Sequence, residues 1–296
     1  MDSLNRRIEF LTRSPLWCIL PDALAAILSQ ALRGESASGF VAAKSTTHGK
    51  PNNKMAVIPV QGVLTKDQDW AGTTYGTIAD AAERAANDPA VKRIVLAVDS
   101  PGGEVTGLPE TAAVLRQVAK VKPVSAIVEG AAASAAYWLT SQAHDITVAP
   151  SAEVGSVGVR MMHVDVSKML DDQGYKVTEL YSGNFKTEWS PFKPLSDAAM
   201  ADMQTRLDSV HNDFIKAVAE GRGVAPNRPT GKAANSRYGE GRMFSAQQAM
   251  GMGLADKILS PREFYKSVTP TEEKPDAPVF GLSTRRARLA LEKARV

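Results

Sequence analysis

The chain has very few residues of the two types that most often bind metals or form disulfides: one cysteine and four histidines occur among its 296 residues. The single cysteine, Cys18, excludes a disulfide within the chain and fits a reducing compartment. We expect it to be a small buried hydrophobic residue. The net charge of +3 is too small to indicate nucleic acid as a partner.

Long apolar runs are also missing. No segment approaches the roughly 18 apolar residues that a membrane-spanning helix needs. The apolar run from Leu16 to Leu20 ends at Pro21 and Asp22, so it is also too short for the apolar region of a secretory signal. We therefore predict a cytoplasmic protein without a membrane anchor.

Composition divides the chain into three zones. Residues 1–53 combine an apolar, helix-compatible stretch with a linker rich in Gly, Ser, Thr and Lys. Residues 54–262 are long enough to bury one substantial core. Residues 263–296 are rich in basic residues and proline, which indicates a flexible tail. We predict an N-terminal helical extension with a linker, one large domain and a basic C-terminal tail.

Strands and helices alternate through the large zone. Apolar spacing predicts strands over 55–63, 93–98, 124–128, 146–149, 177–181 and 254–259. It predicts helices over 78–87, 102–120, a segment carrying Tyr137 and Leu139, 196–221 and 245–251. Such alternation predicts an α/β fold of stacked βαβ units around a largely parallel sheet. Loops at the carboxyl ends of its strands are the expected place for chemistry.

Two short segments carry a candidate catalytic pair. Ser134 lies among small residues, where a peptide backbone can approach its hydroxyl, and Lys186 lies between Phe185 and Thr187. A lysine with its ordinary pKa of about 10.4 is almost entirely protonated at neutral pH, so a basic lysine requires burial that lowers the pKa by roughly two to three units. A neutral lysine beside a serine can activate the hydroxyl for peptide-bond cleavage without histidine.

Three further positions fit the same chemistry. Ser156, in Gly-Ser-Val-Gly, offers a hydroxyl that can orient the lysine amine. An oxyanion needs preorganised backbone donors. Glycine allows a backbone to approach closely, so Gly103, together with Gly102, is one candidate, and the amide of Ala135 at a helix start is the other.

Plainer interpretations stay open on these residues alone. Ser134 also suits close helix packing, and Lys186 also suits a solvated loop. Ser100 is a rival nucleophile, because it too follows a strand. A Ser-His-Asp triad has no supporting motif around the four histidines, which are His48, His144, His163 and His211. Asp171 and Asp172 have no metal-ligand spacing, so we predict no metal and no cofactor.

Five segments, 98–103, 131–137, 155–159, 182–186 and 253–256, occur in an order that resembles the signal peptide peptidase A-like serine peptidases. The resemblance implies a ClpP/crotonase-like fold and a Ser-Lys dyad. It assigns Ser134 as nucleophile, Lys186 as base and Ser156 as the lysine-orienting hydroxyl. It also implies that the amides of Gly103 and Ala135 form the oxyanion hole, with Gly102 in contact with substrate. The chain has Ala135 and Ala136 where this family usually has glycines.

The short N-terminal element without an anchor resembles the phage or prophage capsid protease branch of that family. The resemblance implies a ring-shaped homo-oligomer that processes scaffold, portal or coat proteins in the bacterial host cytoplasm or inside the prohead. Within a ring, Lys186 serves its own subunit or a neighbour. Two alternatives stay open: a cytoplasmic peptidase of signal peptides or other oligopeptides, and a non-catalytic scaffold module of the same fold.

Overall fold

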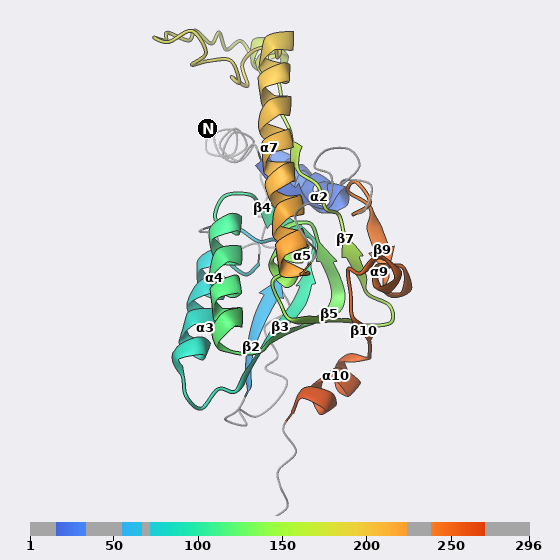
Figure 1. Ribbon diagram of the computed structural model, residues 1–296. Coiled ribbons are helices and arrows are strands. Elements are labelled where there is room, and N and C mark those ends of the chain that lie inside the picture. The colour runs from blue at the N-terminus through green and yellow to red at the C-terminus, as the bar shows by residue number, and fades with distance from the viewer. Residues whose placement is uncertain (1–15, 34–54, 67–71, 224–237, 270–296) are drawn as a thin grey trace, which may run out of the picture.

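The computed structural model describes residues 16–33, 55–66, 72–223 and 238–269 (Figure 1). Its centre is a largely parallel sheet. Five strands run parallel in the order β10-β6-β5-β3-β2. They are β2 (Met55–Gln61), β3 (Arg93–Ser100), β5 (Val124–Ala133), β6 (Asp145–Val148) and β10 (Lys257–Ile258). The predicted α/β architecture with a largely parallel sheet is confirmed.

Helices α3 (Tyr75–Asn87) and α4 (Leu108–Val121) lie side by side against one face of this sheet (Figure 1). Strand β3 follows the period of two: Ile94, Leu96 and Val98 point into the main core, whereas Val95 and Ala97 lie on the other face. That second face is packed by Phe264 of α10 (Pro261–Val268). Both faces of the centre of the sheet are therefore buried, as expected for parallel strands.

The carboxyl end of β5 reaches beyond its neighbours and pairs with a further strand. Strand β7 (Glu153–Gly155) runs parallel to residues 131–133 of β5, and β9 (Met243–Ser245) pairs antiparallel with β7. Helix α5 (Ala135–Thr140) starts directly after β5, with Ser134 between the two elements. Helix α9 (Ala246–Met252) follows β9. The segment that the sequence suggested as a small-residue loop is therefore the end of a strand.

A second, three-stranded antiparallel sheet lies at the same edge, in the order β4-β1-β8. Its strands are β4 (Gly102–Glu104), β1 (Leu16–Ile19) and β8 (Arg160–Met161). Helix α2 (Pro21–Arg33) follows β1, and its residues Leu24 and Ile27 pack in a small apolar cluster with Trp17, Ile19 and Val63. The sequence predicted the helix in the N-terminal zone but not the strand.

Helix α7 (Asp197–Gly221) is long and projects away from the sheet (Figure 1). Ser196 caps its start by accepting a hydrogen bond from the Ala199 amide at 3.2 Å. Near its other end, Phe214 stacks on Trp138 of α5 with ring centroids 4.7 Å apart. Arg222 then donates to both carboxylate oxygens of Asp256. The C-terminal half of α7 therefore packs against the core.

Several predicted elements differ from the structure. The helix expected over 102–120 begins at Leu108, because residues 102–104 pair with β1. Within the described residues, 177–181 form no strand: they are largely exposed and have no neighbouring strand to pair with. The segment after residue 260 begins with a helix, α10, whose start is fixed by a capping box between Ser260 and Glu263. Helix α6 (Ser167–Asp172) was not predicted either.

Within the described residues, no helix combines the length and the apolar character needed to cross a membrane.

Candidate active site

Ser134 occupies a strained turn between β5 and α5. Its backbone has φ 52° and ψ −117°, a conformation that residues with a side chain rarely adopt. The elements on both sides enforce this conformation. The Ser134 amide donates to the Gly155 carbonyl at 2.8 Å, and the Ser134 carbonyl accepts from the Trp138 amide at 3.0 Å. Such conformations cost of the order of 1–3 kcal/mol and cluster at functional sites.

The strain at Ser134 gives a stability prediction. Glycine adopts positive φ without a steric penalty. The free energy of unfolding of Ser134→Gly is therefore expected to exceed that of Ser134→Ala by about 1 kcal/mol, so the glycine variant should unfold at a higher urea concentration. Equilibrium urea unfolding of the two purified variants measures the difference. Equal stabilities would mean that the turn stores no strain.

The Ser134 hydroxyl faces two groups. Its Oγ donates to the Gly158 carbonyl at 3.3 Å. The hydroxyl also forms a hydrogen bond with the thiol of Cys18. Burial raises the pKa of this thiol to about 12, although the hydrogen bond with Ser134 acts to lower that pKa. Ser134 is only 1% exposed, so the hydroxyl has no open path to solvent. Cys18 is buried, as the sequence predicted, but its place against Ser134 was not anticipated.

Gly102 and Gly103 form β4, at the same edge of the sheet as Ser134. Gly102 has φ 103°, and a Cβ there would lie 2.1 Å from the Cys18 carbonyl oxygen. A Cβ on Gly103 would lie 1.9 Å from the Leu64 carbonyl oxygen. Both positions therefore require glycine for steric reasons, whatever their amides do in catalysis.

Ser100, the rival nucleophile, has a structural use for its hydroxyl. The Oγ donates to the Gly62 carbonyl at 2.7 Å and accepts from the Gly102 amide at 3.2 Å. The side chain is fully buried. Ser100 thus braces the turn that leads into Gly102 and Gly103.

Ala135 opens helix α5, so its amide is one of the first-turn N–H groups that have no carbonyl partner within the helix. Ala135 and Ala136, where the resembling family usually has glycines, are both fully buried in the main core. Their methyl groups therefore add to packing.

Ser156 follows β7 and has φ 53°, a second strained serine at this edge. Its amide donates to the Arg242 carbonyl at 2.7 Å. The residues on either side, Gly155 and Gly158, accept hydrogen bonds from the amide and the hydroxyl of Ser134. The structure thus brings the segments of Ser134, Gly103 and Ser156 to one edge of the molecule.

Lys186 lies elsewhere, in a segment that we call the arm, residues 173–196. The Lys186 side chain is exposed, and among the described residues no hydrogen bond joins it to Ser134 or Ser156. Trp189 anchors the arm to α7 through Arg206, whose guanidinium lies 4.3 Å from the centre of the indole ring. Arg206 precedes Phe214 by eight residues, which is about 12 Å along a helix axis. Figure 1 shows the yellow chain of the arm at the end of α7 that is farther from the sheet.

The histidines of the described residues contact groups other than Ser134. His144 Nδ1 accepts from the Val124 amide at 3.1 Å, and His163 Nε2 lies 2.9 Å from the Ser190 carbonyl oxygen. Burial lowers the pKa of His211, and a hydrogen bond with the Val157 backbone offsets this only in part. His48 lies outside the described residues. Among the described residues no histidine is hydrogen-bonded to Ser134, so no Ser-His-Asp triad is assembled.

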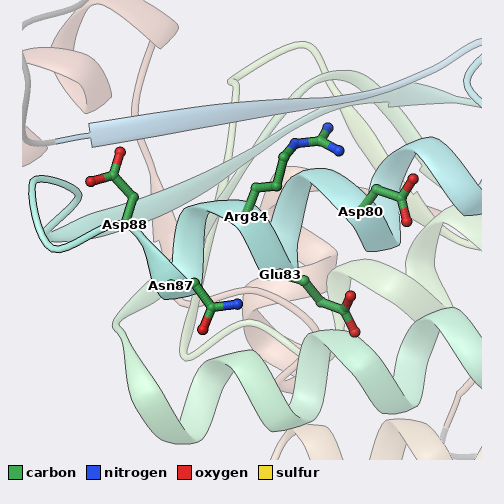
Figure 2. Close-up of a pocket in the computed structure, with 5 residues that line it drawn as sticks. All are labelled: Asp80, Glu83, Arg84, Asn87 and Asp88. Atoms are coloured by element: carbon green, nitrogen blue, oxygen red, sulfur yellow. The ribbon is translucent and has the colours of Figure 1, made fainter.

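Asp171 and Asp172 are exposed on α6. Within the described ranges, no three side chains of the metal-ligating types gather at one place. A surface pocket does exist beside α3, lined by Asp80, Glu83, Arg84, Asn87 and Asp88 (Figure 2). Helix α3 runs antiparallel to the strands that it joins, so the Asp88 end of this pocket lies toward the opposite end of the sheet from Ser134.

Comparisons with known proteins point to one family. The model of peptidase family S49 matches residues 116–273. Capsid assembly protease C of Escherichia phage lambda is 32% identical over 70% of this chain and 47% of its own length. The head-tail preconnector protein GP5 of Enterobacteria phage P21 is 32% identical over 70% of this chain and 41% of its own length. The chain thus spans less than half the length of these two relatives.

A solved structure is also similar. It is a mutant of the 1510-N membrane-bound stomatin-specific protease, with 17% sequence identity and a TM-score of 0.46. The similarity covers 72% of this chain and 84% of that one.

Proposed function

Since the chain belongs to peptidase family S49, we propose that it is a serine endopeptidase with Ser134 as nucleophile and Lys186 as base. The observation that carries the proposal is the strained strand-to-helix turn at Ser134, held beside Gly103 and the 155–158 segment. Strain at a buried serine in such a turn is hard to explain by packing alone, because glycine would occupy the position at lower energy.

The proposed reaction has two steps and uses Ser134, Ser156 and the backbone donors of this edge together with Lys186. The Ser134 hydroxyl attacks the scissile carbonyl carbon while a neutral Lys186 amine, oriented by the Ser156 hydroxyl, takes the proton. The amides of Gly103 and Ala135 stabilise the oxyanion, and each such donor typically contributes about 3–4 kcal/mol. The lysine then protonates the leaving amine, and water hydrolyses the ester to regenerate Ser134.

The position of Lys186 supports a site completed by a second copy of the chain. Lys186 follows a run of exposed apolar side chains in the arm: Tyr175, Val177, Leu180, Tyr181 and Phe185. Leu180 is 94% exposed, and Phe185 is 75% exposed. A cluster of large apolar residues at the surface marks a protein interface more often than free surface. We propose that the arm packs on a neighbouring subunit of a homo-oligomeric ring and places Lys186 there beside Ser134.

The phage relatives suggest the substrates. Their names refer to capsid assembly and to the head-tail preconnector. We propose that this chain processes scaffold, portal or coat proteins during head maturation, in the host cytoplasm or inside the prohead. The proposed peptidase domain is residues 54–262, preceded by the extension and followed by the basic tail.

Purified full-length protein tests this function when it is incubated with an unfolded reporter protein and, separately, with any scaffold, portal and coat proteins that its neighbouring genes encode. We expect internal cuts that produce discrete fragments, read by mass spectrometry. Cleavage restricted to short apolar peptides would instead favour an oligopeptidase. Intact substrates throughout would favour a non-catalytic module.

A further inference from the structure

Strand β1 fills the gap between the two walls of the candidate site. On one side it pairs antiparallel with β4, where Cys18 lies opposite Gly103 and Ile19 opposite Gly102. On its other side it pairs antiparallel with β8, where Trp17 lies opposite Arg160. Strand β8 begins two residues after Gly158, whose carbonyl accepts the Ser134 hydroxyl. Residues 16–19 thus lie as an added strand across the edge that holds Ser134.

The register of β1 places a backbone carbonyl at the proposed oxyanion donor. The Leu20 amide donates to the Pro101 carbonyl at 2.9 Å, and the Val105 amide donates to the Leu16 carbonyl at 3.3 Å. Hydrogen-bonded pairs alternate along an antiparallel ladder. The pair midway between these two bonds, Cys18 and Gly103, is therefore of the hydrogen-bonded type, so the Gly103 amide donates to the Cys18 carbonyl.

The side chains of β1 are also placed as expected for a strand that occupies the candidate site. The Cys18 thiol contacts the Ser134 hydroxyl and is fully buried. Trp17 and Ile19, on the opposite side of the strand, are buried in the cluster formed with α2 and Val63. Addition of an extended peptide as a further strand of a sheet is a common way in which proteins bind peptides.

We propose that β1 is an intramolecular ligand of the peptide-binding cleft, which keeps the site closed until a substrate or a partner displaces it. The proposal rests on the function proposed above, since it takes the cleft between β4 and β8 to be the peptide site. A tethered strand acts at an effective concentration in the millimolar range. The apparent affinity for a free substrate then equals the affinity of the open cleft multiplied by the fraction of molecules in which the cleft is open.

The only cysteine of the chain reports on this equilibrium without any need for catalysis. In full-length Ser134→Ala protein, we expect iodoacetamide to alkylate Cys18 slowly, because the thiol is buried and burial raises its pKa to about 12. Adding the peptide acetyl-Leu-Trp-Ser-Ile-Leu-amide, which has the sequence of residues 16–20 with serine in place of Cys18, should displace β1. The alkylation rate should rise at least about tenfold and then saturate.

Variants that weaken the packing of β1 test the same proposal through peptide binding. We expect the double variant Trp17→Ala, Ile19→Ala to bind a fluorescein-labelled form of this peptide at least about tenfold more tightly than its parent, read by anisotropy. Phe264→Ala is the matched control, because it removes a buried side chain from the cluster on the far face of the sheet and should leave peptide binding unchanged. Circular dichroism checks that all variants are folded.

The proposal is overturned if the double variant binds no peptide, or if bound peptide leaves the alkylation rate of Cys18 unchanged. With Ser134 intact, the double variant should also cleave an unfolded protein several-fold faster than the wild type. If the peptide raises the alkylation rate of Cys18 and no variant cleaves protein, the proposed peptidase function is wrong, whereas the proposal that β1 closes the cleft is supported. If the enzyme is active and Cys18 does not respond, the closed cleft fails alone.

Discussion

Ser134→Ala is expected to reduce peptide-bond cleavage by at least about 10⁴-fold while the protein stays folded, because loss of a serine nucleophile typically costs this much or more in kcat. The alanine methyl group fits where the buried serine Cβ already lies, and the turn keeps its backbone bonds to Gly155 and Trp138. The measurement is the initial rate of fragment release from an unfolded protein, with thermal unfolding as the check on folding.

Ser141→Ala is the matched control for this loss. Ser141 is also buried, directly after α5, and its hydroxyl donates to the Trp138 carbonyl at 2.7 Å. Its removal should lower stability by about 1–2 kcal/mol and leave kcat within a few-fold of the wild type. Turnover retained in folded Ser134→Ala protein would contradict the assignment of the nucleophile.

Lys186→Ala is expected to lower the same rate by at least about 10³-fold, because the serine then has no base to accept its proton. Lys176→Ala, in the same exposed arm, serves as the control and should keep its activity. Loss of activity in both variants would indicate that the arm matters for assembly and that Lys186 has no particular role.

The position of Lys186 makes a sharper prediction. If the arm delivers the lysine to a neighbour, co-refolded Ser134→Ala and Lys186→Ala subunits form some sites with an intact serine from one copy and an intact lysine from the next. Random mixing in equal amounts should restore about a quarter of wild-type activity. A mixture as inactive as either variant would contradict exchange between subunits and would mean that each lysine acts within its own chain.

Sequence reasoning found the parts of the site that topology places together. Parallel strands bring their carboxyl ends to one edge, so the segments after β3 and β5, which hold Gly103 and Ser134, were expected to meet there. Strand β7 was not predicted, and Ser156 was proposed from its hydroxyl and from the family resemblance. The mostly parallel sheet confirms the α/β class, and the family model confirms the peptidase family. The cap at Ser196 and the capping box at Ser245 depend only on residues a few positions apart, so local sequence patterns suffice to indicate where those two helices start.

The remaining differences arise from contacts between distant segments. Residues 16–19 form a short apolar run that suits a helix or a strand equally well, and only their pairing with 102–104 and 160–161 decides. The same pairing makes a strand of Gly102–Glu104, which local signals placed in a helix. Residues 177–181 contain β-branched and aromatic side chains typical of a strand, but they find no neighbouring strand among the described residues. The distance between Lys186 and Ser134 depends on the packing of the arm along α7, which no local pattern encodes.

The central claim is that Ser134 forms a covalent ester with its substrate. The direct measurement is a peptide map of wild-type protein that is acid-quenched during turnover of an unfolded protein substrate. The account predicts a substrate fragment ester-linked to the peptide that contains Ser134, and no such adduct in Ser134→Ala protein. An ester located on Ser100, on Ser156 or on any other residue during turnover would contradict it.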